Sequence, residues 1–205
     1  MSPRRRHAAG RARNARGDAT RARLLRAATE LLEQGGYAAA TVAAVTARSG
    51  VAAGALYRHF PSKAELFVEV FRSEAEHELE ALYEASAGPG AATEKLDAIV
   101  REFAVGALEH PRLAWALVYE PVDPLVDAER LAYRQTYRER LADLLRFGIE
   151  REELPAQDPD LTAASLIGAI SEALVGPLSP VGEDVDTERL VAALSGFCRR
   201  AVGAA

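Results

Sequence analysis

The chain has 205 residues, of which 49% are hydrophobic, so it can bury the core of one large domain or two small ones. Its single cysteine, Cys198, excludes an intramolecular disulfide framework and fits a reducing compartment, which we expect to be the cytoplasm. No apolar run follows the arginine-rich N-terminus, and we therefore expect no signal peptide. Residues 1–63 hold twelve Arg or Lys and three Asp or Glu, although the net charge of the whole chain is −5. This division indicates that one end of the protein meets a polyanion and the other does not.

The first third of the chain predicts a basic arm and four helices. Residues 1–17 are mainly Arg, Ala and Gly without apolar periodicity, which favours a mobile basic arm over a tail that only aids solubility. From Asp18, leucines at helical spacing predict a helix that ends at Gly35-Gly36. The next two predicted helices are short, and the fourth is long. They run from the N-cap Thr41 to Arg48, from Ala53 to His59, and from the N-cap Ser62 to Gly88.

The second half of the chain predicts longer helices and no strand. The expected helices cover residues 93–109, 112–119, 126–151 and 161–175, and a last helix opens at Asp186. The result is an all-α protein of about nine helices. We divide it into the arm at 1–17, an N-terminal domain at 18–77 and a C-terminal domain at 78–205. Residues 161–178 are the most membrane-like stretch, but they carry Glu172 and many small residues, so a buried interface helix is the preferred interpretation.

Residues 41–60 have the outline of a helix-turn-helix, because two short helices are joined by a tight turn at Gly50. The second helix would enter the major groove of DNA, where small side chains at its start allow close approach. Hydroxyl, imidazole and ammonium groups around it are placed to reach phosphates. The candidate DNA-binding residues are Thr41, Thr46, Arg48, Ala52, Ala53, Gly54, Tyr57, Arg58, His59 and Lys63.

The stretch TVAAVTARSGVAAGALYRHFPSKAELF resembles the DNA-binding signature of the tetracycline-repressor (TetR) family of bacterial transcription regulators. The resemblance covers about residues 18 to 70. It implies operator DNA as a partner, a homodimer formed through the last two helices, and an effector pocket between the middle helices. The sequence departs from the family pattern at Ala52–Ala55, where polar side chains are usual, so base recognition would depend more on Thr46, Arg48, Arg58, the arm and DNA shape.

Taken together, aromatic residues in the middle helices suggest a cavity for an apolar ligand, although a single one of them is more often a core residue than a ligand contact. Two glutamates stand out beside them, and a buried carboxylate needs a partner; each could anchor a cationic or hydroxylated ligand, or cap a neighbouring helix. The candidate ligand-binding residues are Phe103, Trp115, Tyr119, Glu120, Tyr133, Tyr137 and Glu172.

No catalytic constellation or metal-ligand spacing is present in the sequence, so we expect neither an enzyme, nor a cofactor, nor a metal site. The preferred hypothesis is a ligand-responsive transcriptional repressor that a small apolar effector releases from its operator. An activator and a regulator without an effector remain open. The alternative from another class is a helical ligand-binding or interaction protein without operator binding, which the alanine-rich second helix leaves open.

Overall fold

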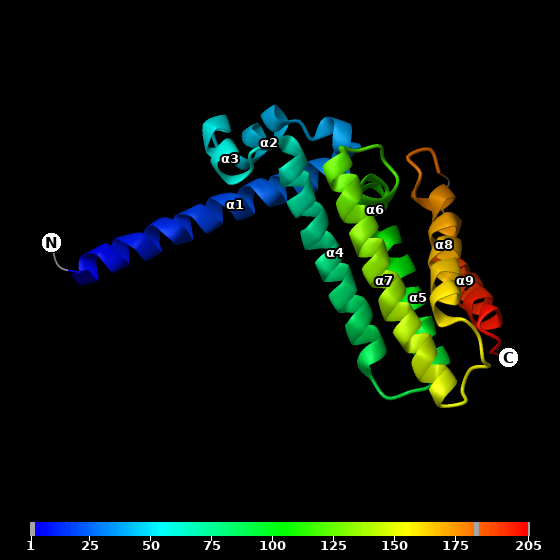
Figure 1. Ribbon diagram of the computed structural model, residues 1–205. Helices are drawn as coiled ribbons and strands as arrows, with labels where there is room; N and C mark the ends of the chain where they lie inside the picture. Colours follow the sequence, from blue (N-terminus) through cyan, green and yellow to red (C-terminus); the bar gives the residue numbers. More distant parts are fainter. Residues whose placement is uncertain (1–2, 183–184, 205) are drawn as a thin grey trace.

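The computed structural model describes residues 3–182 and 185–204, with the side chains of residues 15–182 and 185–204. All regular structure in these residues is helical (Figure 1). The helices are α1 (Pro3–Ala39), α2 (Val42–Ser49), α3 (Ala53–His59), α4 (Lys63–Ala87), α5 (Ala92–Glu109), α6 (Pro111–Val118), α7 (Pro124–Glu150), α8 (Pro159–Leu178) and α9 (Thr187–Ala201). The prediction of an all-α chain is therefore confirmed for the described residues.

Local capping explains why most boundaries agree with the sequence. The side chain of Ser62 accepts the N–H of Glu65 at the start of α4, and Asp158 accepts the N–H groups of Asp160 and Leu161 at the start of α8. Such side chains satisfy N–H groups that the first turn of a helix leaves without a partner. Because each of these hydrogen bonds joins residues that are close together in the chain, the capping residues can be recognised before the fold is known.

Helix α1 differs from its prediction at its N-terminus. It begins at Pro3 and not at Asp18, so the backbone of residues 3–17 continues the helix and extends away from the other helices (Figure 1). Ala and Arg are strong helix formers, which explains a helix that needs no apolar face there. At its other end α1 is interrupted at Gly36, whose φ of 71° and ψ of −170° are not helical. The glycine pair thus breaks the helix as expected.

The described residues form two hydrophobic cores, and α6 contributes to both. The first core joins α1, α2, α3 and the start of α4, and it also contains Leu113 and Ala116 of α6. The second core joins α5, α7, α8 and α9, and Trp115 and Tyr119 of α6 pack against it. Helix α4 runs through the predicted domain boundary at residues 77 and 78, so the long helix belongs to both parts. We call α1 to α3 with the start of α4 the head, and the remaining helices the body.

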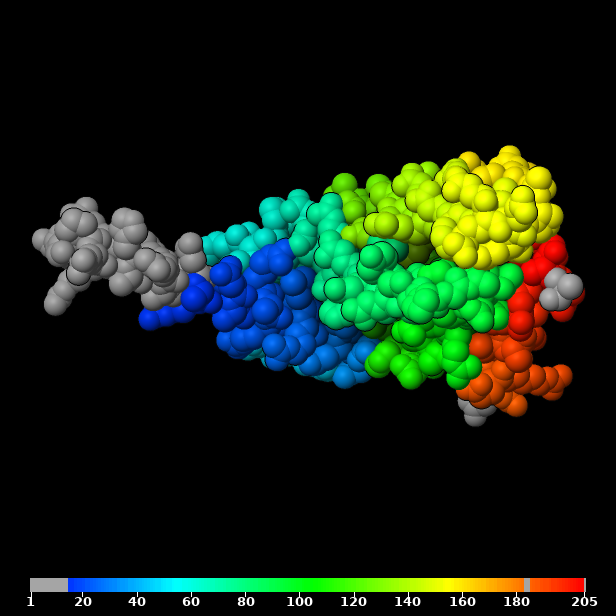
Figure 2. Space-filling view, turned by 90° about the horizontal axis from the view of Figure 1, so that it is seen from below, coloured from blue at the N-terminus to red at the C-terminus, as the bar shows by residue number. Residues whose placement is uncertain are grey.

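Helices α8 and α9 form the end of the body remote from the head, and in Figure 2 the blue and red parts of the chain lie on opposite sides. Both helices leave large apolar side chains exposed, since Leu161 is 65% and Phe197 is 45% exposed. Among the described residues one helix, α8, is long and apolar enough to cross a membrane by length and composition, with 28% of its apolar window buried. A helix that packs against another protein surface meets the same criterion, so this observation is weak evidence for a membrane.

Candidate nucleic-acid interface and internal cavity

The turn between α2 and α3 is fixed by residues whose roles are visible in the sequence. Thr41 caps α2 by accepting the N–H of Ala44 at 3.1 Å. Gly50 ends α2 in the left-handed region, with φ 63° and ψ 27°, which glycine adopts without steric cost. Leu56 and Phe60 are buried in the first core and hold α3 against α1. The opposite side of α3 is therefore turned to solvent.

All ten predicted DNA-binding residues lie at the surface of the head, either exposed or partly exposed. Ala52, Ala53 and Gly54 are exposed at the start of α3, so the backbone there is open to close approach. Tyr57 is 52% exposed, and Arg58 beside it forms no hydrogen bond or ion pair with any described residue. Thr46 donates to the carbonyl of Ala43 at 3.0 Å. These positions permit the predicted roles in DNA binding, which remain predictions.

Two of the cationic candidates already have partners inside the protein. Arg48 forms an ion pair with Glu30 at 3.3 Å and donates to Oε1 of Gln34 at 2.6 Å, which ties α2 to α1. The Nζ of Lys63 donates to the carbonyl of Tyr37 at 3.0 Å and lies 4.0 Å from the centre of the Tyr37 ring. Burial lowers the pKa of Lys63, an effect that the charge of Glu120 opposes. Arg58 is consequently the candidate cation most available to DNA.

The body contains a partly open cavity of about 830 Å³. Its walls come from α4, α5, α6, α7 and α8, and they are mainly apolar and aromatic. Four of the seven predicted ligand-binding residues line it. These are Phe103, Tyr119, Tyr133 and Tyr137.

The other three candidates lie outside the cavity wall, contrary to the expectation that they would face it. Trp115 packs against the second core, with its ring 5.1 Å from that of Tyr119. Glu172 points to solvent, because its position on α8 lies outside the packed face. Glu120 accepts the backbone N–H of Tyr37 at 2.6 Å and so binds the end of α1, which is the helix-capping alternative left open above.

The contact of Glu120 explains the glycine at position 36. A Cβ atom on Gly36 would collide with the Glu120 carboxylate, and the φ of 71° is one that other residues rarely adopt. Gly36, Tyr37 and Glu120 together form what we call the junction between head and body.

Arg130 connects the cavity wall to this junction. Its guanidinium donates to the carbonyls of Ala116, Leu117 and Glu120 at 2.7, 2.6 and 2.8 Å, so it satisfies the C-terminal end of α6. The side chain is only 11% exposed. Sequence reasoning missed this role, because Arg130 is one of several arginines on α7 and no local pattern distinguishes it.

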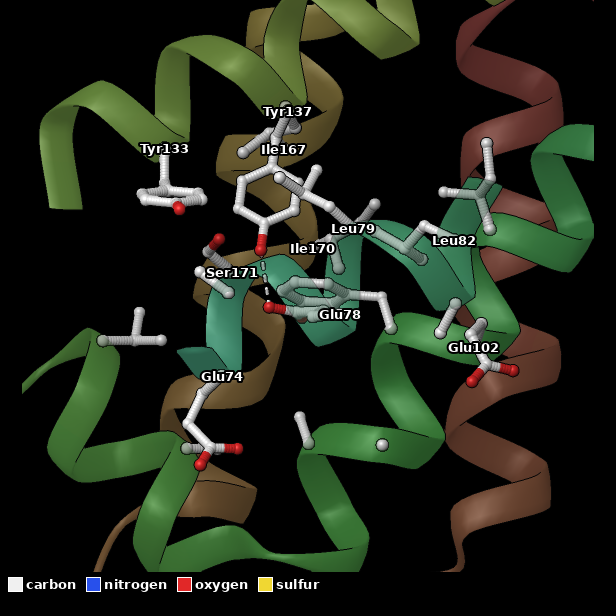
Figure 3. A pocket seen from close by; sticks show the side chains of 18 of the residues that line it. Glu74, Glu78, Leu79, Leu82, Glu102, Tyr133, Tyr137, Ile167, Ile170 and Ser171 are labelled. Atoms are coloured by element: carbon white, nitrogen blue, oxygen red, sulfur yellow. Dashed lines mark hydrogen bonds between the residues drawn. The ribbon is translucent and has the colours of Figure 1, made fainter. Parts of the chain in front are cut away.

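Helix α4 contributes three glutamates to the cavity lining, of which Glu80 is exposed; the partly buried Glu74 and Glu78 were missed. Tyr137 donates its hydroxyl to Oε2 of Glu78 at 2.6 Å, and the two side chains meet from α7 and α4 (Figure 3). Glu74, one helical turn earlier, accepts the hydroxyl of Thr29 at 3.3 Å. A signal was present in the sequence, because both glutamates share a helical face with Phe67, Phe71 and Leu82, which are all buried.

The helix-turn-helix of α2 and α3 at the surface of the head, together with the cavity in the body, defines a helical DNA-binding regulator. Residues 24–70 match the family described as bacterial regulatory proteins, tetR family, and residues 89–174 match the tetracyclin repressor-like C-terminal domain. The chain belongs to the tetR family, whose members are DNA-binding transcriptional regulators and not enzymes.

Curated relatives match this chain over part of their length. The HTH-type transcriptional repressor KstR of Rhodococcus jostii is 46% identical over 56 residues, which is 27% of this chain and 26% of that protein. The HTH-type transcriptional activator FasR of Mycolicibacterium smegmatis is 29% identical over 131 residues, 62% of this chain and 59% of that protein. The chain thus spans about a quarter of KstR and under two thirds of FasR.

Solved structures agree over more of the chain. The regulator FadR from Bacillus subtilis, in complex with stearoyl-CoA, superposes with a TM-score of 0.76 at 20% identity, covering 86% of this chain and 96% of that one. At this identity the likeness shows that the two proteins share a fold.

Proposed function

We propose that the protein is a ligand-responsive repressor, in which a small apolar molecule bound in the cavity releases the head from operator DNA. The observation that carries the proposal is the mainly apolar cavity of about 830 Å³ bordered by α6, the helix that belongs to both cores. Cavities of this size and composition are typical of small-molecule sites. The similarity to the repressor KstR, which is confined to 56 residues, supports repression. The similarity to the activator FasR makes activation the alternative.

A chain of direct contacts supports coupling between the cavity and the head. Leu117 and Arg130 line the cavity, and Arg130 holds the end of α6 through three carbonyls. Glu120 follows α6 and binds the backbone of Tyr37 in the head. A ligand that displaces α6 therefore moves the acceptor to which α1 is bound. It changes DNA affinity only if it binds the displaced state more tightly than the resting state.

We further propose that the protein acts as a cytoplasmic homodimer that joins through α8 and α9. The exposure of Leu161 and Phe197 supports this, and Gly168 leaves open space on α8 where another helix can approach. Stable homodimers of this kind bury about 2,000 Å² or more. Two heads would then contact half-sites about 34–36 Å apart, one turn of DNA, so a change in their spacing weakens binding.

Selection from a pool of random duplexes tests the proposal. The purified chain should enrich an inverted repeat, and apolar compounds that bind the chain should release that DNA in a fluorescence anisotropy assay. A matched Arg58→Ala variant should lose enrichment while it still binds the compounds. Compounds that bind without changing DNA affinity would refute ligand response, and the absence of any enriched sequence would favour the ligand-binding protein without an operator.

A further inference from the structure

The wall of the cavity formed by α4 is acidic. Glu74 and Glu78 are four residues apart, so they lie on the same side of the helix, and both line the cavity (Figure 3). Oε2 of Glu78 accepts the Tyr137 hydroxyl at 2.6 Å, and Oε1 of Glu74 accepts the Thr29 hydroxyl at 3.3 Å. Each carboxyl group thus has one neutral hydroxyl partner, and its second oxygen has none among the described side chains.

No basic side chain of the described residues neutralises these carboxyl groups, since neither Glu74 nor Glu78 forms an ion pair with Lys or Arg there. Burial raises the pKa of both groups; the Tyr137 hydrogen bond opposes this at Glu78, and Thr29, His77 and His110 oppose it at Glu74. A buried carboxylate without a cation carries a large desolvation cost, and a ligand cation placed beside it would offset part of that cost.

The arginines near the cavity do not supply the missing charge. The guanidinium of Arg130 donates to backbone carbonyls at the end of α6. Arg134 and Arg140 also line the cavity from α7, but both are exposed, so water and salt weaken the effect of their charges there. His77 and His110 are exposed as well. Arg130 therefore lines the cavity with its donors already held by backbone carbonyls, whereas Glu74 and Glu78 each keep one carboxyl oxygen without a partner among the described side chains.

Aromatic rings favour the same charge on the ligand. The cavity is lined by six Phe or Tyr rings, and the rings of Phe71 and Tyr133 are 5.4 Å apart in an edge-to-face arrangement. The face of an aromatic ring attracts cations and gives no comparable attraction to anions. The six residues are Phe71, Tyr83, Phe103, Tyr119, Tyr133 and Tyr137.

We infer that the effector is an apolar amine, whose protonated nitrogen pairs with the second carboxyl oxygen of Glu78 while its apolar part fills the cavity. Glu74 lies one turn away and adds negative charge on the same wall. This inference rests on the proposed function and gives the effector's chemical class. It also separates this chain from FadR of Bacillus subtilis, whose stearoyl-CoA ligand has an anionic head group.

Three probes of equal chain length test the inference on the unmodified protein. Decylamine, decanol and decanoic acid, each below its micelle concentration, are titrated into the full chain by isothermal calorimetry at neutral pH. We expect decylamine to bind about tenfold or more tightly than decanol, because it adds an ion pair, and decanoic acid to bind most weakly. Equal affinities for the amine and the alcohol, or tighter binding of the acid, would overturn the inference.

A variant identifies the group that holds the amine. Glu78→Gln keeps an acceptor for Tyr137 but loses the charge, so it should lose about tenfold or more of the affinity for decylamine while leaving that for decanol unchanged. The matched control is Glu84→Gln, an exposed glutamate on the same helix that does not line the cavity. An equal loss for both ligands in Glu78→Gln would show that the side chain only shapes the cavity. Should the variant fail to fold, the three-probe comparison still decides.

DNA release separates this inference from the proposed function. If decylamine binds through Glu78 but leaves DNA affinity unchanged, the cavity is an amine site as inferred, but the amine is not an effector and ligand-responsive repression is wrong. If decanol releases DNA while decylamine does not bind, the repressor mechanism stands and the amine inference is wrong.

Discussion

Replacing Arg130 tests whether the end of α6 is held as the structure indicates. Arg130→Met keeps the length of the side chain but removes the donors for three carbonyls at 2.6 to 2.8 Å. A hydrogen bond from a charged group contributes about 1.5–3 kcal/mol, and the three share one side chain, so their contributions do not add fully. Each buried carbonyl that is left without a donor costs about 1–3 kcal/mol. We therefore expect the free energy of unfolding to fall by about 3 kcal/mol.

The assay is urea unfolding followed by circular dichroism, with two comparison variants. Arg130→Lys keeps the charge but not the planar fork of donors, so its stability should lie between those of wild type and Arg130→Met. Arg138→Met removes an exposed arginine of the same helix whose Nη2 donates to Gln135 at 2.5 Å, and it should change stability by about 0.5 kcal/mol or less. If Arg130→Met also changed stability by no more than about 0.5 kcal/mol, the reasoning about α6 would be wrong.

Three further outcomes are expected. Phe197→Glu should shift the protein from dimer to monomer in sedimentation, whereas Leu131→Glu, at a site that is 65% exposed on α7, should not; a dimeric Phe197→Glu would argue against α9 as the interface. Deletion of residues 1–16 should reduce the slope of log K against log salt by about 0.9 for each phosphate that the protein no longer neutralises, and an unchanged slope would show that this segment does not touch DNA. Glu78 has a folded pKa above its unfolded value, so its contribution to stability is present below the unfolded pKa of about 4.3 and is lost as pH rises. The stability of the Gln variant relative to wild type should therefore rise as pH increases above the unfolded pKa of about 4.3, and a difference independent of pH would contradict the burial of this carboxyl group.

Most of the fold could be predicted because its boundaries are local. Thr41 and Ser62 cap the helices that they were expected to cap, each through a hydrogen bond to a residue three positions later. The start of α1 was the exception. Apolar periodicity indicates a packed face, and residues 3–17 are helical without that pattern.

The cavity was predicted less completely, because its residues are chosen by packing between helices. Trp115 and Tyr119 were both candidate ligand-binding residues, yet only Tyr119 reaches the cavity; its hydroxyl donates to the carbonyl of Ser171 on α8 at 2.5 Å. The partner of Glu120 lies 83 residues away in the sequence, and no local pattern could identify it. Glu78 could have been found, since it is polar on a face that is otherwise buried.

The junction also limits how this protein can be recombined with its relatives. The head contributes Gly36 and the N–H of Tyr37, while the body contributes the carboxylate of Glu120 that binds there. A chimeric regulator that joins this head to the body of a relative would need a hydrogen-bond acceptor where Glu120 stands. A chimera that joins this body to another head would need a glycine opposite the Glu120 carboxylate. Residues 36 and 120 should therefore be exchanged as a pair in domain-swap engineering, even though they belong to different parts of the chain.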